Sequence, residues 1–223
     1  MLEFDATTHT YKYDGIDIPS VSEILRFCHR EVYEEPDKFL MDQAADRGTR
    51  VHAAAQELDT LGCTTADPDI TQYVSAYVKF LKEHIVRWEL IEQPVAFSRF
   101  VGMTLETRTP EYAGTIDRFG ALDGEPVLLD IKTTSKITKK HKLMYAAQLA
   151  GYAAALICKF RDKAIEEDRE MGEIVFKTAI LQLKSDGTYK LMFVPAEYGI
   201  FEACQKLHEA FAATKRKGKK SNG

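Results

Sequence analysis

The tightest constraint on this chain is a two-residue turn, Asp123-Gly124, between two runs of strand-forming residues. An Asp-Gly pair flanked by hydrophobic strand patterns is among the strongest short signals for a type I′ β-hairpin. A two-residue loop makes Leu122 the partner of Glu125. Counting outward in that register, the pattern predicts that Asp117 and Asp130 face each other across the strand pair.

The two aspartates fall in a non-hydrogen-bonded position of this hairpin, where Cβ atoms lie about 4.5–5.5 Å apart. Pro126 also falls in a non-hydrogen-bonded position, so its missing N–H is tolerated and supports the register. Two carboxylates so close repel each other unless one is protonated or a cation lies between them. Oxygen ligands favour Mg²⁺, Mn²⁺ or Ca²⁺. From the pairing alone, a salt bridge on a solvated face is an equal alternative.

Lys132 favours the metal. It lies two residues after Asp130 and therefore on the same face of the strand. A metal beside an ammonium group can do phosphate chemistry, because the metal polarises a phosphoryl oxygen and lowers the pKa of a bound water. The lysine can help to deprotonate or hold that water, or stabilise charge in the transition state. A register slip of one residue would remove the site. The residues expected on the opposite, apolar face are Val127, Leu129 and Ile131.

The remaining patterns predict one α/β domain over residues 1–214 with a mixed sheet and helices on both faces. Within it, residues 1–35 hold an N-terminal hairpin and a short helix as an addition, with Ser20 and Glu23 at capping-box spacing. Residues 215–223 are expected to be a basic, disordered tail. The predicted helices are 37–61, 69–88, 141–158 and 196–214, the predicted strands are 91–101, 111–120, 126–132, 174–183 and 189–194, and 161–173 is expected to be a solvated loop or polar helix end.

The charge distribution limits the class of partner. The net charge is −4, and removing the five positive charges of residues 215–220 leaves −9 for the rest. An acidic body with local basic strips does not favour tight nonspecific binding of nucleic acid, but it suits an enzyme that engages nucleic acid locally and releases it. Lys136, Lys139 and Lys140 follow the predicted metal strand. They would lie at the mouth of the site and hold phosphates, or form a solvated charged loop.

Apolar runs and cysteines indicate the compartment. No apolar run approaches the roughly 18–20 residues needed to span a bilayer, and the first residues lack the pattern of a signal peptide. We therefore expect a cytoplasmic protein without membrane association. The four cysteines, Cys28, Cys63, Cys158 and Cys204, include no CxxC pair, so unpaired thiols are expected.

Four segments, in order, resemble the PD-(D/E)XK nuclease superfamily and, more narrowly, its RecB-type exonuclease branch. RGTRVH (47–52) is similar to the upstream helical histidine element and GTIDR (114–118) to the GxxD element. LDIKTT (129–134) is similar to the (D/E)xK element and QLAGY (148–152) to the QxxxY element. Any one of these is weak, but the four together at sensible spacing form a specific signal over the middle half of the chain.

The resemblance implies a restriction-endonuclease-like core and hydrolysis of phosphodiester bonds that leaves a 5′-phosphate. It implies Mg²⁺ or Mn²⁺ as the cofactor. Cys158 and Cys204 stand far apart in sequence, so we expect no iron–sulfur cluster. The chain resembles the compact members found in bacteriophages and in the mitochondrial genome maintenance exonuclease. From the likeness to the phage members we expect the cytoplasm of a bacterial or phage-infected cell. The implied metal ligands are His52, Asp117, Asp130 and the Ile131 carbonyl, Lys132 is the implied catalytic lysine, and Gln148 and Tyr152 would orient it or contact the substrate backbone.

The residues carry simpler interpretations as well. Taken alone, His52 is more often a core or surface histidine, although Ala44, Gly48 and Ala55 give it a stripe of small residues that lets its helix approach the sheet closely. Gln148 and Tyr152 share a helix face and could simply pack. A supporting carboxylate at Glu92, at the start of a predicted strand, is a minor alternative.

Several functions agree with these patterns. The first is a DNA exonuclease acting on single- or double-stranded ends in recombination, repair or replication, alone or with a recombination partner protein. The second is a structure-specific endonuclease. The third is a catalytically silent nucleic-acid-binding module, which predicts a broken centre, and the fourth is a trimming partner in a CRISPR adaptation complex. The sequence leaves open the polarity, the strand preference, DNA or RNA, the number of metal ions and the oligomeric state.

Overall fold

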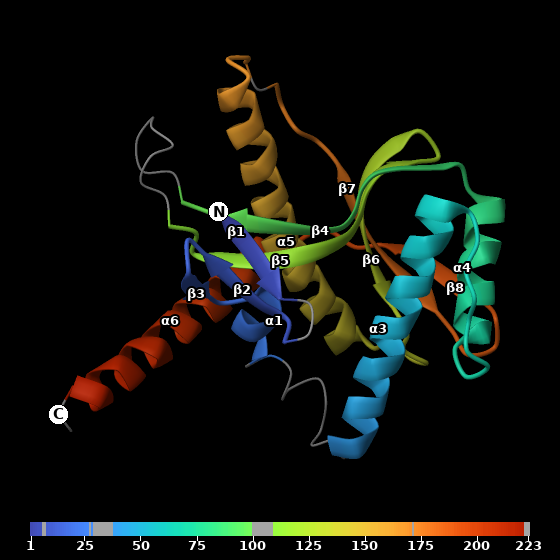
Figure 1. Ribbon diagram of the computed structural model, residues 1–223, viewed down its shortest axis with the longest axis horizontal. Coiled ribbons are helices and arrows are strands. Elements are labelled where there is room, and N and C mark those ends of the chain that lie inside the picture. The colour runs from blue at the N-terminus through green and yellow to red at the C-terminus, as the bar shows by residue number, and fades with distance from the viewer. Residues whose placement is uncertain (6–7, 27, 29–37, 100–108, 171, 221–223) are drawn as a thin grey trace.

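A five-stranded mixed sheet forms the centre of the protein, with strand order β4-β5-β6-β7-β8 (Figure 1). The structure is a computed structural model that describes residues 1–5, 8–26, 28, 38–99, 109–170 and 172–220. The sheet is mixed because β6 pairs antiparallel with β5 and parallel with β7. The strands are β4 (Val86–Phe97), β5 (Tyr112–Leu122), β6 (Glu125–Lys132), β7 (Lys177–Leu183) and β8 (Tyr189–Phe193).

The predicted hairpin joins β5 to β6. Asp123 has φ 52° and Gly124 has φ 86°, and a type I′ turn requires positive φ at both of these positions. Leu122 pairs with Glu125, so the register of the hairpin is confirmed.

The regular ladder between β5 and β6 ends one position before the two aspartates, at the Arg118–Leu129 pair. Beyond it, a side chain replaces the backbone pairing, because Asp117 Oδ2 accepts a hydrogen bond from the Ile131 N–H at 2.6 Å. Asp117 and Asp130 therefore lie where the register predicts, at the point where the two strands begin to separate.

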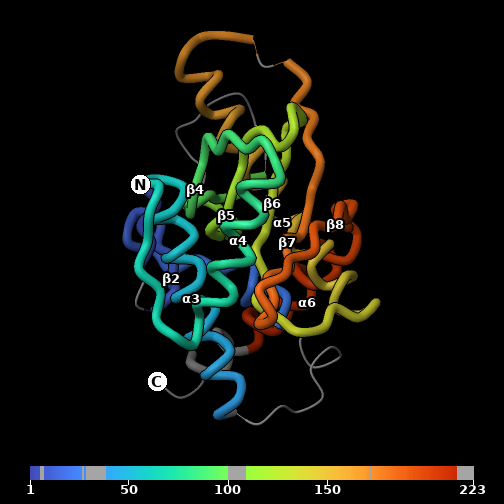
Figure 2. Tube along the Cα trace, turned by 90° about the vertical axis from the view of Figure 1, so that its right-hand side faces the viewer, coloured from blue at the N-terminus to red at the C-terminus, as the bar shows by residue number. Residues whose placement is uncertain are grey.

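Helices cover both faces of the sheet, as expected. On one face Val127, Leu129 and Ile131 pack in a hydrophobic cluster with residues of α3 and α4, which lie side by side in Figures 1 and 2. On the other face Leu128 and Ile180 pack with residues of α1, α5 and α6. The helices are α1 (Val21–Ile24), α3 (Lys38–Leu61), α4 (Thr71–Glu83), α5 (Lys139–Glu166) and α6 (Tyr198–Lys220).

Helix α5 is the central core helix on its side of the sheet. Among the described residues it is the helix long and apolar enough to cross a membrane by length and composition, yet 67% of that apolar window is buried inside the protein. Its contacts with β4, β5, β6 and α6 account for the apolar composition. At its start Thr138 accepts a hydrogen bond from the His141 N–H and so caps the helix.

A second, three-stranded sheet forms the N-terminal part of the chain. β2 (Thr10–Tyr13) and β3 (Ile16–Ile18) form the predicted hairpin, and β1 (Leu2–Asp5) adds a strand that we did not predict. Ser20 caps α1 as expected and accepts the Glu23 N–H at 2.9 Å. This sheet joins the central one where Ser20 forms a parallel bridge with Ala113 and the Ala113 N–H donates to the Pro19 carbonyl.

Two predicted boundaries were wrong. The second predicted helix, 69–88, ends at Glu83 in α4, because the backbone is extended from His84 and β4 begins at Val86. Val86 and Trp88 pack beside the α3–α4 cluster as strand residues, so tertiary packing overrides the helical pattern. The third predicted helix, 141–158, ends too early: α5 continues through Glu166, so the first part of the charged stretch 161–173 is a polar helix end, one of the two forms expected for it, since lysine, arginine, alanine and glutamate all favour helix.

The backbone of α6 continues to Lys220, past residue 214, where we expected a disordered tail to begin. Lysine and arginine favour helix, and positive charge near a helix C-terminus interacts favourably with the helix dipole. Residues 37, 100, 101, 171 and 221–223 of the predicted segments, and residues 6, 7, 27 and 29–35 of the N-terminal addition, lie outside the described residues.

Two glycine substitutions test the turn. Gly124→Ala should lower the free energy of unfolding by about 1–2 kcal/mol, because alanine is strained at a positive φ. Gly199→Ala should raise it by about 0.4–1 kcal/mol, because this glycine lies in α6 and an added Cβ would meet only open space. Urea unfolding of both variants measures the difference, and a Gly124→Ala variant as stable as wild type would contradict the type I′ turn.

Candidate active site

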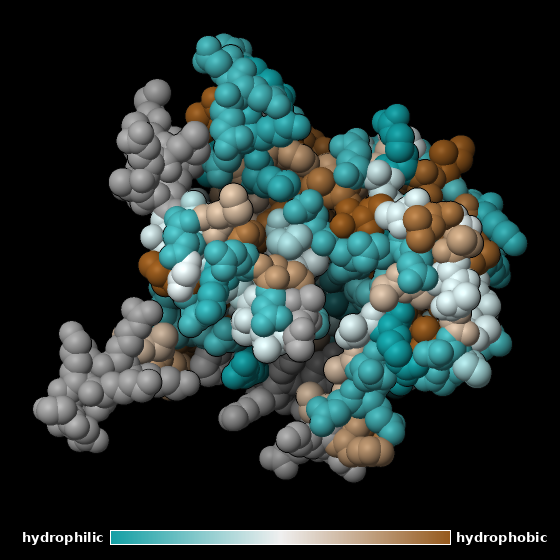
Figure 3. Space-filling model, in the orientation of Figure 1, coloured by the Kyte–Doolittle hydropathy of each residue, from teal (hydrophilic) through white to brown (hydrophobic). Residues whose placement is uncertain are grey.

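One cavity of about 490 Å³ brings the predicted site residues together. It lies between α3, α5, the N-terminal sheet, the middle of β4 and β5, and the end of β6. Figure 3, which has the orientation of Figure 1, shows the surface hollowed between the N-terminal sheet and α3. The predicted residues that line it are His52, Asp117, Asp130, Lys132, Gln148 and Tyr152.

An imidazole and two carboxylates form a candidate metal centre in this cavity. Atoms of His52, Glu92 and Asp117 that could ligate a metal all lie within 4.8 Å of one another. His52 Nδ1 is 3.2 Å from Glu92 Oε1 and 3.6 Å from Asp117 Oδ1. Its Nε2 lies 3.2 Å from the carbonyl oxygen of Ile131. Imidazole, carboxylate and carbonyl groups together suit a divalent cation such as Mg²⁺ or Mn²⁺.

The charge on His52 follows from its neighbours. Burial lowers its pKa, but the charge of Asp117 and the hydrogen bond and charge of Glu92 outweigh burial and raise the pKa to about 9. Both ring nitrogens face oxygen atoms, which is the arrangement that a protonated imidazole satisfies. A metal ion bound to this histidine would displace one of its protons.

The two aspartates are enclosed: Asp117 is 7% exposed and Asp130 is 2% exposed. Burial raises the pKa of Asp117, and it raises that of Asp130 to about 6 although the Lys132 charge opposes the rise. Asp130 Oδ2 forms an ion pair with Lys132 Nζ at 2.7 Å but receives no well-aligned hydrogen bond from the described residues. Carboxylates held in this way are stabilised by a bound cation, so the donor set fits a divalent metal.

Lys132 lies at the end of β6 with its ammonium group between Asp130 and the ring of Tyr145. Nζ is 5.1 Å from the ring centroid, a cation–π distance. Burial lowers the pKa of Lys132, but the charges of Asp130 and Asp117 raise it above the usual value for lysine. The side chain is thus held as a cation beside the candidate metal centre.

The glutamine–tyrosine pair reaches the site from α5. Gln148 Nε2 donates to the Tyr152 hydroxyl at 3.0 Å, one helical turn away. The Tyr152 ring lies against Gly114 on β5, where a Cβ would be 2.6 Å from a ring carbon. Glycine at the first position of the GxxD segment therefore leaves the space that lets Tyr152 reach the cavity.

Sequence reasoning missed the buried network that holds Glu92. Arg118, with no exposed surface, donates from Nη1 to Glu92 Oε1 at 2.9 Å and from Nε to Asp59 Oδ2 at 2.6 Å. The Tyr77 hydroxyl also donates to Asp59 Oδ2. A charged residue on the apolar face of a predicted central strand was the available signal for this network, because buried arginine needs carboxylate partners.

Two groups of residues do not lie where the sequence predicted relative to the cavity. Lys136, Lys139 and Lys140 are exposed and do not line the cavity. Phe4, on the N-terminal sheet, does line it, as do two other residues of that sheet and the loop before β2, His9 and Tyr11. Their position depends on docking of the sheet onto β5, for which the sequence offers no local signal.

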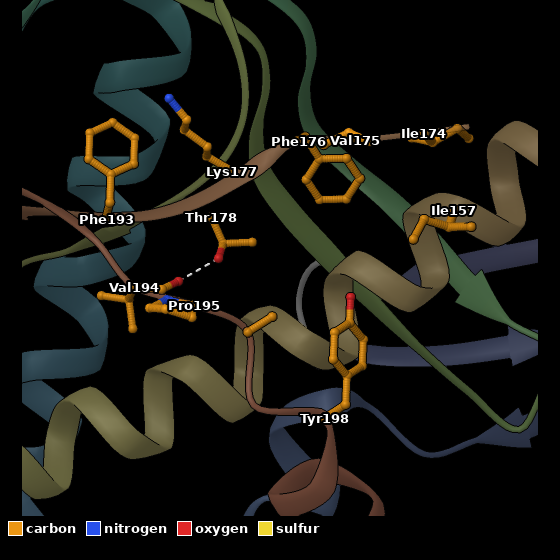
Figure 4. A pocket seen from close by; sticks show the side chains of 11 residues that line it. Ile157, Ile174, Val175, Phe176, Lys177, Thr178, Phe193, Val194, Pro195 and Tyr198 are labelled. Carbon is orange, nitrogen blue, oxygen red and sulfur yellow. Dashed lines mark hydrogen bonds between the residues drawn. The ribbon is translucent and has the colours of Figure 1, made fainter. Parts of the chain in front are cut away.

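A second cavity, of about 460 Å³, lies between α5, β7, β8 and the segment that leads into α6 (Figure 4). Its walls are mostly apolar, and Thr178 there donates a hydrogen bond to the Val194 carbonyl. Lys177, its charged lining residue, forms an ion pair with Glu125 at 3.4 Å. Neither histidine nor a carboxylate is among the described residues lining it, so the metal chemistry belongs to the first cavity.

The chain was compared with known proteins, solved structures and protein families. No curated protein matches the chain. The crystal structure of SSO0001 is similar over 86% of this chain and 73% of that chain, with 12% sequence identity and a TM-score of 0.41. The sequence model of the PD-(D/E)XK nuclease superfamily matches residues 24–218, which include α3, the β5–β6 hairpin and α5. The chain belongs to the PD-(D/E)XK nuclease superfamily.

Proposed function

We propose that the protein is a Mg²⁺- or Mn²⁺-dependent deoxyribonuclease that hydrolyses phosphodiester bonds from DNA ends. The observation that carries this proposal is a single cavity that holds a three-residue candidate metal centre and, beside it, the Asp130–Lys132 ion pair. Superfamily membership supports a metal-dependent nuclease. Our proposal goes further than the family in two respects: cleavage starts at DNA ends, and it serves recombination, repair or replication.

The residues divide the chemistry between them. A bound divalent cation would polarise a phosphoryl oxygen and lower the pKa of a bound water. Lys132 is placed to stabilise negative charge that develops on the phosphate. Tyr152, held by Gln148, is placed to orient Lys132 or the DNA backbone. The residues that would hold the metal are His52, Glu92, Asp117, Asp130 and the carbonyl oxygen of Ile131.

The shape and charge of the site support action at ends. The cavity is bounded by α3 on one side and by the N-terminal sheet on the other, so a strand end enters it more easily than the middle of a duplex. The net charge of −4 disfavours extended electrostatic binding along duplex DNA. A structure-specific endonuclease is the second candidate, because the same centre could cut at a flap. A silent binding module is disfavoured, since Asp117, Asp130 and Lys132 are all in place.

Removal of the lysine tests the site. Lys132→Ala should lower kcat for release of nucleotides from linear DNA by about 10²–10³-fold, as expected when a preorganised charge is lost from a transition state. Lys136→Ala is the matched control, because this exposed lysine on the same chain segment does not line the cavity. Cleavage by Lys132→Ala at the wild-type rate would overturn the assignment of the site.

Substitution of a carboxylate tests the metal. Asp117→Asn should weaken Mn²⁺ binding at least tenfold in calorimetry, because an anionic ligand becomes neutral. Asp17→Asn, on the exposed strand β3, should bind Mn²⁺ as wild type does. Wild-type affinity in Asp117→Asn would refute its role as a ligand.

Substrate topology tests the mode of cleavage. The protein should release acid-soluble nucleotides from linear DNA in the presence of Mg²⁺ or Mn²⁺ and leave covalently closed circular DNA intact, because a circle offers no end. Chelation of the metal should stop the reaction. Linearisation or fragmentation of closed circles would reject the exonuclease and support the endonuclease, and cleavage of none of these substrates would reject the nuclease.

A further inference from the structure

We infer that the aromatic side chains of Phe4 and His9 form a base-stacking wall of the active-site cavity, so that the enzyme takes an unpaired DNA strand. The inference rests on the proposed nuclease function and adds the substrate class: single-stranded DNA, or a duplex with an unpaired end. The wall belongs to the N-terminal sheet and to the turn before β2, and it faces the same cavity as the candidate metal centre.

The wall has a defined geometry. Phe4 stacks on Tyr11, with ring centroids 4.8 Å apart and an interplanar angle of 23°. His9 meets the edge of Phe4 at 5.9 Å and 88°. Phe4 and Tyr11 are direct cross-strand partners on β1 and β2, so they present their rings on one face of the sheet. Three rings from two strands and a turn therefore form one continuous aromatic surface.

Tyr11 fixes this surface to the active site. It is 5% exposed, and its hydroxyl lies 2.8 Å from Thr115 Oγ1 on β5. Thr115 and Asp117 lie two residues apart on the same strand, about 6–7 Å along it and on the same face. The aromatic wall thus begins one strand repeat from the candidate metal centre, the distance at which a nucleotide neighbouring the scissile phosphate would lie.

The three aromatic residues differ in how much of each side chain is exposed to solvent. Tyr11 is buried, Phe4 is half-buried and His9 is exposed, so the two outer rings can meet a ligand while Tyr11 holds them in place. The accessible faces of these rings offer a flat apolar surface in a cavity that also holds charged groups. A nucleobase supplies the matching flat apolar surface, and stacking tolerates any base because every base has a π face.

The electrostatics of the cavity also favour recognition through bases. The metal centre is acidic, and the exposed lysines Lys136, Lys139 and Lys140 do not line the cavity. Beyond Lys132 and the candidate metal centre, the described lining offers few contacts for further phosphates, so stacking is the main remaining sequence-independent source of affinity for the neighbouring nucleotides. A base can stack on protein rings only after it leaves its own duplex, which selects an unpaired strand.

The wall is an addition to the common nuclease core. The superfamily match begins at residue 24, so β1, β2 and β3 precede it. A segment outside the matched region that nevertheless walls the active-site cavity is suited to setting substrate choice and not the chemistry.

An abasic-site scan tests the wall. Binding of fluorescein-labelled 15-nucleotide single strands would be measured by anisotropy with Ca²⁺, in the Lys132→Ala background so that the strand stays intact. One abasic residue, moved along the strand from each end, should weaken binding about 5- to 100-fold at one or two positions. With Phe4→Leu or His9→Ala added, the intact strand should bind correspondingly more weakly, and the abasic residue should then make little further difference.

Tyr13→Leu is the matched control. Tyr13 lies two residues from Tyr11 on the same strand and in the same small cluster, but it does not line the cavity. It should keep the full abasic penalty, which separates stacking from general damage to the sheet. Phe4→Leu in the otherwise wild-type enzyme should reduce cleavage of single strands more than cleavage of blunt duplexes.

An abasic penalty that persists unchanged in Phe4→Leu and His9→Ala would overturn the inference, as would equal losses in Tyr13→Leu. Either result leaves the nuclease proposal standing if wild-type protein cleaves linear DNA. Absence of cleavage by wild type on every substrate rejects the nuclease proposal instead, whatever the binding data show.

Discussion

The enclosure of charge at the point where β5 and β6 separate is the constraint on which the rest of this structure depends. Asp117 and Asp130 are nearly inaccessible to water, and buried carboxylates are costly unless cations lie beside them. Lys132 meets Asp130, His52 meets Asp117, and Arg118 holds Glu92 from the opposite face of the sheet. Helix α3 is thus positioned by charge as well as by apolar packing, and a divalent cation would bring the enclosed groups closer to neutrality.

Backbone geometry is adapted to the same purpose at Glu92. This residue has φ 45° in the middle of β4, a conformation that non-glycine residues rarely adopt, between the pairs Ile91–Arg118 and Gln93–Ile116. Such strain persists where surrounding contacts enforce it, and it is concentrated at functional sites. Here the Arg118 and His52 contacts fix the carboxylate in the cavity.

Sequence patterns predicted those features of the fold and the site that follow from residues close together in the chain. The Asp-Gly turn set the register of β5 and β6, and alternation along β6 placed Lys132 on the face of Asp130. Contacts between residues distant in sequence were beyond those rules. They include the Arg118–Asp59 pair, the docking of Phe4 and Tyr11 over β5, and the approach of Cys28 Sγ to within 3.1 Å of Cys204 Sγ, two thiols that the sequence separates widely. Such contacts follow from how helices and sheets dock, which no local pattern encodes.

The position of β6 as the middle strand separates two parts of the active-site cavity by their resistance to local opening. β6 is paired with β5 up to Leu129 and with β7 through Lys132, so exposing the backbone around Asp130 and Lys132 requires opening of the middle of the central sheet and has a free energy near that of global unfolding. The N-terminal sheet is joined through the bridge between Ser20 and Ala113 and opens at lower cost. Amide hydrogen exchange should therefore be slow on one wall and faster on the other, and the outer wall can move or diverge in sequence while the reactive groups stay in register.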